Sequence, residues 1–223
     1  REEKKIRQTI AYELETLLPY GIDDCLLDYN IIGQTRHSEI LSALVSRFAV
    51  KERISLFGEN PPFIGTIMIG ALPVASLLSE SGQFTGSGLL LEIGDREAVA
   101  VFVEGEKIVQ VRHFAFGGNA GNLCRELANT MACLKWDGIM GETPAQIFLT
   151  GAGSQMNSVK EELVRFFSLP VEAVDLSSLN EIVLPDEIKG SWKAPIMNQA
   201  LALAVHDYKK GQGFNFPLVE VVK

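Results

Sequence analysis

The sequence lacks several features that would place it in a membrane, nucleic-acid-binding or secreted class. No apolar run approaches the ~18 residues that a membrane span needs, and no charged segment followed by an apolar one marks a secretion signal. Basic residues form no stripe, and the net charge of −8 argues against a nucleic-acid partner. Only three cysteines occur, with no Cys-x-x-Cys pair, so we expect free thiols in a reducing cytoplasm.

Motifs that carry enzymatic chemistry are also absent. The three histidines, His37, His113 and His206, are isolated and show no metal-ligand spacing. Neither Ser87 nor Ser154 stands in a Gly-x-Ser-x-Gly nucleophile elbow. No Gly-x-Gly-x-x-Gly motif follows a first strand, which argues against a dinucleotide-binding fold. These residues do not support a metabolic enzyme.

The composition does allow substantial folded cores. The chain has 223 residues, of which 47% are apolar, enough for one large or two modest domains. It starts at Arg1 rather than Met, and its first helix opens without a capping residue. We therefore expect that a natural N-terminal portion precedes it.

The first half predicts a small unit of helices and strands. A Ser- and Gly-rich stretch over 79–88 reads as a linker or loop, so we expect one domain over 1–80 and a second over 81–223. The elements expected in the first domain are a helix over 6–18, strands over 25–32 and 39–46, a helix over 48–57, a strand over 65–71 and a helix over 73–79.

The second half predicts a β-meander followed by mixed helices and strands. Short turns separate its first three strands, and Asn119 can cap the long helix that follows them. The expected elements are strands over 89–93, 98–103 and 107–116, a helix over 120–136, a strand over 147–150, a helix over 156–167, an edge strand over 169–172 and an Ala-rich helix over 195–208.

Two of these strands run directly into glycine turns. Ile147–Thr150 leads into Gly151-Ala152-Gly153-Ser154, and Leu89–Ile93 leads into Gly94-Asp95. Glycine permits positive φ and leaves backbone N–H groups accessible, as phosphate and nucleotide sites require. The alternative is that both are ordinary turns of an α/β domain.

The order of these motifs resembles the second domain of the actin-like ATPase superfold, a ribonuclease H-like α/β fold with mixed sheets. More narrowly, the chain resembles PilM-type pilus-assembly proteins and the cytoplasmic domain of the type II secretion protein GspL. The segments that carry the resemblance are Leu17-Leu18-Pro19-Tyr20 with Asp28-Tyr29, Arg112 with Gly117-Gly118, and Asn198–Ala204 with Gly213–Phe216. The resemblance implies that the first phosphate loop lies upstream of Arg1.

The sequence departs from a working ATPase of this superfold in the second phosphate loop. Glu92, Gly94 and Asp95 stand there without a Ser or Thr, and two acidic groups repel phosphate unless Mg²⁺ intervenes. Gly151, Gly153 and Ser154 keep more of the adenosine-side loop. We therefore expect vestigial nucleotide loops, no catalytic residue and no cofactor in this chain, while weak binding of Mg-ATP by the intact protein stays open.

The resemblance implies a cytoplasmic scaffold at the bacterial inner membrane, in a type II secretion or type IV pilus assembly complex. Its partners would be a membrane-anchored assembly protein, the motor ATPase of the system and a second copy of the chain. The tail residues Phe214, Asn215 and Phe216 resemble a short peptide that docks in a groove in this family, so we assign them to partner binding. The alternative is a tail that packs on its own domain or frays. The alternative function is an ATPase or small-molecule kinase whose catalytic residues precede Arg1.

Overall fold

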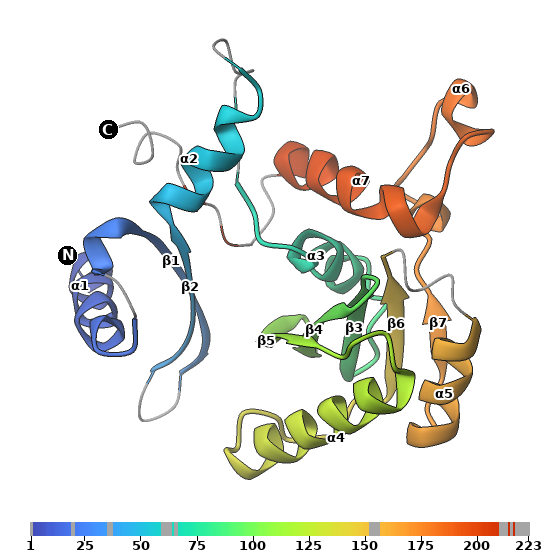
Figure 1. Cartoon of the computed structure of the whole chain (residues 1–223), viewed down its shortest axis with the longest axis horizontal. Coiled ribbons are helices and arrows are strands. Elements are labelled where there is room, and N and C mark those ends of the chain that lie inside the picture. Colours follow the sequence, from blue (N-terminus) through green and yellow to red (C-terminus); the bar gives the residue numbers. More distant parts are fainter. Residues whose placement is uncertain are drawn as a thin grey trace. The chain divides into compact units, whose positions relative to one another are not determined.

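This computed structural model describes residues 2–18, 21–34, 38–58, 64, 67–151, 157–209, 214 and 216 (Figure 1). The chain divides into two compact units. One contains the described residues of Arg1–Ile69 and Gly213–Lys223, and the other those of Gly70–Gln212. The second unit is thus inserted into the first along the chain.

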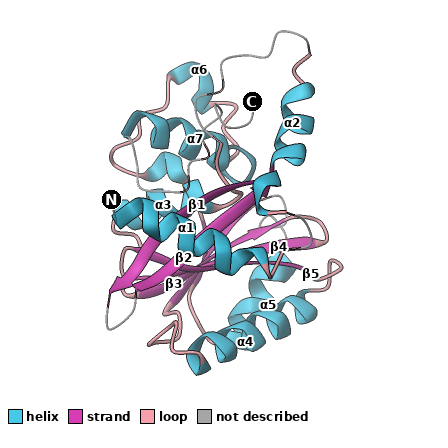
Figure 2. Cartoon of the chain, turned by 90° about the vertical axis from the view of Figure 1, so that its left-hand side faces the viewer, coloured by secondary structure: helices cyan, strands magenta, loops and turns pink. Residues whose placement is uncertain are grey.

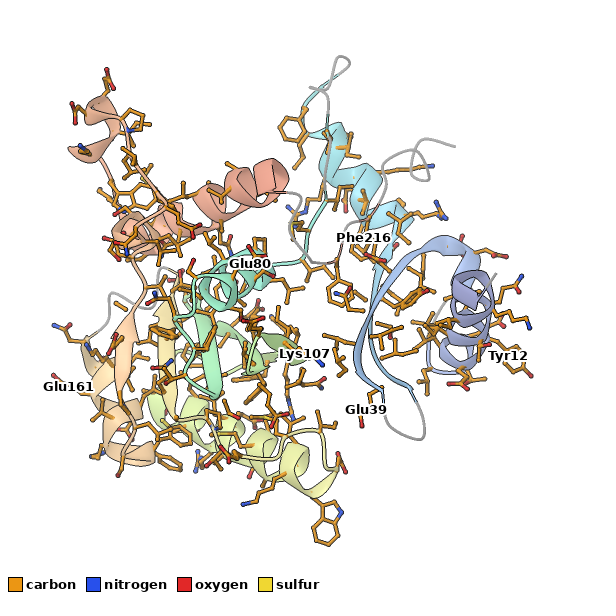
Figure 3. All side chains as sticks on the ribbon, turned by 180° about the vertical axis from the view of Figure 1, so that it is seen from behind. Tyr12, Glu39, Glu80, Lys107, Glu161 and Phe216 are labelled. Carbon is orange, nitrogen blue, oxygen red and sulfur yellow. The ribbon has the colours of Figure 1, made fainter. Side chains whose placement is uncertain are left out.

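A two-stranded antiparallel ribbon with two helices forms most of the first unit. Its register runs from Cys25 opposite Ser46 to Gln34 opposite Ser38. Figure 3 shows Tyr12 on the outer side of its helix, away from the ribbon, and this side chain is 74% exposed. The elements are α1 (Glu2–Glu15), the 3-10 helix η1 (Ile22–Asp24), β1 (Cys25–Gln34), β2 (Ser38–Ser46) and α2 (Arg47–Ser55).

Two tail residues are part of the interior of the first unit. Phe214 is 3% exposed and Phe216, labelled in Figure 3, is fully buried. The amide of Phe216 donates a hydrogen bond to the carbonyl of Ile67 at 3.3 Å. Residues from both ends of the described chain therefore stabilise one unit.

The expected strand over 65–71 is wrong in its described part. Residues 67–69 pair with no strand, and Gly70 and Ala71 form a turn that leads into the next helix; residues 65–66 lie outside the described residues. An apolar run forms a strand when a neighbour completes its ladder of hydrogen bonds. Here the tail contributes one such bond, at Ile67.

The second unit is built on a five-stranded mixed sheet in the order β5-β4-β3-β6-β7. The predicted meander is confirmed, because β3, β4 and β5 pair antiparallel. Strand β6 pairs parallel with both β3 and β7. The strands are β3 (Ser87–Ile93), β4 (Glu97–Glu104), β5 (Lys107–Ala115), β6 (Gln146–Thr150) and β7 (Val171–Ala173).

Helices cover both faces of this sheet (Figure 1, Figure 2). Helices α3 (Leu72–Glu80) and α7 (Ala194–Lys209) contact each other on one face, and α4 (Ala120–Trp136) and α5 (Asn157–Phe167) do so on the other. Because β3 is central and covered twice, its apolar side chains are all buried. Two short helices that the sequence did not predict, η3 (Leu176–Ser178) and α6 (Asp186–Lys189), precede α7.

Local signals in the sequence explain where these helices begin. The Asn119 side chain accepts a hydrogen bond from the amide of Asn122, so the predicted cap of α4 is confirmed. Pro73 lies in the first turn of α3, where its missing N–H costs nothing. Helix α3 belongs to the second unit, whereas the division expected at residue 80 assigned it to the first. The reason is tertiary packing, because α3 contacts α7 and β4, which belong to the second unit.

All three cysteines are free thiols, as the sequence predicts. No helix among the described residues is long and apolar enough to cross a membrane.

We predict that truncating the Phe216 side chain destabilises the first unit. Phe216→Ala removes a fully buried ring and should lower the free energy of unfolding by about 3–5 kcal/mol. Urea denaturation with a probe in the first unit measures this loss. The matched control is Phe48→Ala, which changes a 74% exposed ring of the same unit and should cost less than about 0.5 kcal/mol. Equal stability of the two variants would contradict the assigned packing of the tail.

Candidate functional site

The carboxyl ends of two parallel strands lie next to each other in the second unit. Glu92, near the end of β3, is opposite Thr150, the last residue of β6. The two glycine turns at Gly94 and Gly151 therefore start side by side. Ligands of open α/β sheets bind outside the carboxyl ends of such strands. This strand-end position is the candidate site.

Gly151 passes so close to β3 that no side chain fits. Its φ of +87° lies in the left-handed region, which favours glycine. A Cβ at this position would lie 2.6 Å from the carbonyl oxygen of Ile93 and 3.2 Å from Cγ of Glu92. The close approach of two strand ends is therefore sufficient to explain the glycine.

The first amide of each glycine turn, the described part of the second turn, is already used within the protein. The N–H of Gly151 donates to the carbonyl of Pro195, at the start of α7, at 3.1 Å. The N–H of Gly94 donates to the carbonyl of Glu97 at 2.9 Å. A phosphate-binding loop needs such N–H groups to point at the ligand. These two point at the protein's own carbonyl oxygens.

Glu92 is a half-buried carboxyl held by a side chain of α7. Its Oε1 atom accepts a hydrogen bond from Nε2 of Gln199. Burial raises the pKa of Glu92 above its ordinary value, and the bond from Gln199 acts in the opposite direction without cancelling the rise. The site therefore favours the neutral form of this carboxyl more than water does.

Asn198, the neighbour of Gln199, is fully buried and connects three segments. Its Oδ1 atom accepts from the amide of Leu176 at 3.1 Å. Its Nδ2 atom donates to the carbonyl of Val174 at 2.9 Å and to Oγ1 of Thr150 at 3.4 Å. One side chain thus joins α7 to the end of β6 and to the segment after β7.

The turn between β3 and β4 is closed by the end of β5. The carbonyl of Arg96 accepts from the amides of Phe116 and Gly117 at 2.9 and 3.0 Å. Gly118 has a φ of +78°, and a Cβ there would lie 3.3 Å from the carbonyl oxygen of Asp95. Asp95 itself is exposed. The Gly-Gly pair found in the sequence therefore packs against this turn.

The structure brings together part of the residue set expected from the sequence. Glu92 and Gly151 are in close contact, and Gly94 follows β3 directly. Phe214 and Phe216, expected at a partner surface, are buried by the chain's own residues, and their role in partner binding stays a prediction. Three of the expected residues lie outside the described residues: Gly153, Ser154 and Asn215.

Sequence reasoning missed the residues of α7 that complete the site. Pro195, Asn198 and Gln199 each bond to a strand end or to the segment beyond it. A signal was available, because two adjacent amides interrupt the apolar, Ala-rich first three turns of the helix. Their partners could not be deduced, since Glu92 lies more than a hundred positions away in the chain.

At this position the described residues gather no group of metal ligands, and three of their polar groups bond within the chain. Mg²⁺ binds carboxylate and water oxygens in a near-octahedral arrangement. Among the described residues, no three His, Cys, Asp or Glu side chains gather to hold a metal ion. The Glu92 carboxyl is occupied by Gln199, and the Gly94 and Gly151 amides are occupied by backbone carbonyls.

Comparison with known proteins identifies the fold. No protein-family model and no curated protein matches the sequence. A solved PilM–PilN type IV pilus biogenesis complex matches with a TM-score of 0.72 at 15% identity, over 92% of this chain and 73% of that chain. A protein of unknown function with an actin-like ATPase fold from Bacteroides thetaiotaomicron VPI-5482 matches with a TM-score of 0.44 at 13% identity, over 73% of this chain and 60% of that chain.

The chain has the fold of the protein solved in the PilM–PilN complex, in agreement with the actin-like α/β fold that the sequence predicts. At 15% identity, the likeness to the protein of the pilus complex shows the fold alone.

We predict that the close approach at Gly151 makes this glycine far less replaceable than an open one. Gly138 also has a positive φ, +69°, but a Cβ there would meet no described atom within 4 Å beyond its chain neighbours. Gly138→Ala should cost about 1 kcal/mol of stability from the backbone alone. Gly151→Ala should cost on the order of 3 kcal/mol, because the methyl group also overlaps the Ile93 carbonyl. Chemical denaturation of both variants measures the difference, and equal losses would refute the packing role.

We predict that Glu92→Gln stabilises the protein at neutral pH. A raised pKa means that the folded state binds the Glu92 proton more tightly than the unfolded chain does. The stability contributed by this group is therefore present at low pH and lost as pH rises through the folded-state pKa. The variant stays neutral, so its melting temperature should exceed that of the wild type at neutral pH and match it below about pH 4. Glu172→Gln, at an exposed position of β7, is the control for replacing a surface carboxyl by an amide.

Proposed function

We propose that this chain is a cytoplasmic scaffold of a type IV pilus or type II secretion assembly complex at the bacterial inner membrane. It acts through protein–protein contacts instead of chemistry. The observation that carries the proposal is the match of 92% of the chain to a protein solved as part of a PilM–PilN complex. A PilN-type protein, anchored in the membrane, is accordingly the first partner to test.

The state of the strand-end position supports a scaffold over an ATPase. The Glu92 carboxyl and the amides of Gly94 and Gly151 bond to groups of the same chain. In an ATPase of this fold, the corresponding loops serve the phosphates and Mg²⁺. A protein that uses these groups for its own packing keeps the fold of the ATPases without their hydrolysis of ATP.

Helix α2 supports a function through surface contacts. It has nine residues and buries only Val50, although packing of an apolar face normally stabilises a helix of this length. Phe48 within it, and Leu56 and Phe57 directly after it, are 74%, 74% and 60% exposed. Several large exposed apolar side chains on one short element are a feature of protein interaction sites. We assign this α2 surface (Phe48, Leu56 and Phe57) to the partner.

The decisive experiment mixes the purified chain with the cytoplasmic segment of a PilN-type protein and of its type II secretion counterpart. Isothermal titration calorimetry and light scattering should show a stoichiometric complex with one of them. A scrambled segment of the same composition is the negative control. Phosphate release from Mg-ATP, measured in parallel, should not exceed the blank without protein.

We predict that Phe48→Ser combined with Phe57→Ser weakens this complex at least about tenfold, because burial of two aromatic rings is lost from the interface. The melting temperature should stay unchanged, since both side chains are exposed in the free protein. Unchanged affinity of the double variant would remove the α2 surface from the proposal. Absence of any complex together with phosphate release would instead favour the ATPase or kinase alternative.

A further inference from the structure

The start of α7 bonds to three other parts of the second unit within little more than one turn. The carbonyl of Pro195 accepts from Gly151 after β6, and Gln199 donates to Glu92 on β3. Asn198 bonds to Thr150 and to the segment after β7. We call Pro195, Asn198 and Gln199 the α7 clamp.

Helix geometry explains how adjacent residues reach different strands. Successive side chains of an α-helix diverge by about 100° around its axis. Asn198 therefore faces the end of β6 while Gln199 faces the end of β3, which is the neighbouring strand. Because β3 and β6 are parallel neighbours with Glu92 opposite Thr150, one short piece of helix can bind both strand ends.

The contacts of Asn198 leave no room for an exchangeable ligand at that residue. The side chain is fully buried, its oxygen accepts one bond, and its amide nitrogen donates two. Withdrawing it would strand the amide of Leu176 and the carbonyl of Val174 in the interior, which is costly for buried polar groups. Asn198, the central residue of the clamp, is therefore a structural part of the fold.

We infer that the α7 clamp is the protein's own occupant of the strand-end position, in place of the phosphate-bearing ligand that this position binds in related folds. It bonds to three described polar groups there: the Gly151 amide, one oxygen of the Glu92 carboxyl and the Thr150 hydroxyl. The second unit is then locked in one arrangement without a nucleotide. This inference concerns the second unit alone and does not depend on the identity of the partner.

The amide of Gly151 is a direct reporter of the clamp. Its acceptor is the Pro195 carbonyl, which the substitutions Gln199→Ala and Asn198→Ala leave chemically intact. If the clamp holds α7 in place, either substitution should speed hydrogen exchange at Gly151 by about tenfold or more through local opening. Exchange at Leu90, in the middle of β3, should rise clearly less than at Gly151, because it reports only the loss of global stability. Residue-resolved NMR on the whole chain measures both amides.

The control is Asn180→Ala, which removes an exposed asparagine of the same unit and should leave both rates unchanged. If Asn198→Ala fails to fold, Gln199→Ala, at a half-buried position, still provides the test. Unchanged exchange at Gly151 in Gln199→Ala would overturn the inference. Equal acceleration at Gly151 and Leu90 would also overturn it, because that pattern is global destabilisation and not release of a clamp.

Mg-ATP tests the other half of the inference. Added in millimolar excess to the wild type, it should change neither the melting temperature nor the exchange rate of Gly151. Slower exchange at Gly151 in the presence of Mg-ATP would show that a nucleotide still reaches the strand ends, and would overturn the inference. The scaffold proposal would survive that result, since a protein can bind both a nucleotide and a partner.

Discussion

The parallel pairing of β3 with β6 is the constraint on which the second unit depends. It places Leu89, Leu90 and Leu91 in the fully buried centre of the sheet, with helices on both faces. It also sets Glu92 beside Thr150, so that a polar pair emerges where the apolar strands end. A half-buried carboxyl at that point needs a partner, because leaving it unpaired would cost free energy. Gln199 supplies one, which fixes the position of α7.

The first unit depends on a different kind of constraint, the return of the chain after the second unit. A two-stranded ribbon alone is marginally stable in water and needs apolar cover. Part of that cover comes from the tail, since Phe214 and Phe216 are buried and Phe216 bonds to Ile67. The first unit is thus completed by residues that follow the insertion of the second. The stability of the first unit therefore depends on residues from both sides of the insertion as well as on its local sequence.

Much of the architecture could be predicted from local patterns, because those patterns act over a few residues. Helical spacing and the cap at Asn119 identified α4, and short turns between apolar runs identified the β3–β5 meander. The strand expected over 65–71 failed because strand formation needs a neighbouring strand, which no local pattern reveals. The same limit applied to the candidate site. The glycine turns were visible in the sequence, but the pairing of Gln199 with Glu92 was not.

A ligand site and a structural contact can occupy the same place in one fold. They differ in the hydrogen-bond partners of their polar groups. An N–H that points into open space at a strand end can bind a phosphate, whereas one that points at a carbonyl of the same chain stabilises the fold. In this protein, Gly94 and Gly151 are of the residue type found in binding loops. Their N–H groups, however, bond to carbonyl oxygens of the same chain and so stabilise the fold. Glycine at such a turn is therefore weak evidence for a nucleotide, because close packing of strand ends selects it equally well. The amide pair of α7 is the more informative signal, since a polar side chain that is buried in the fold, as that of Asn198 is, needs hydrogen-bond partners there.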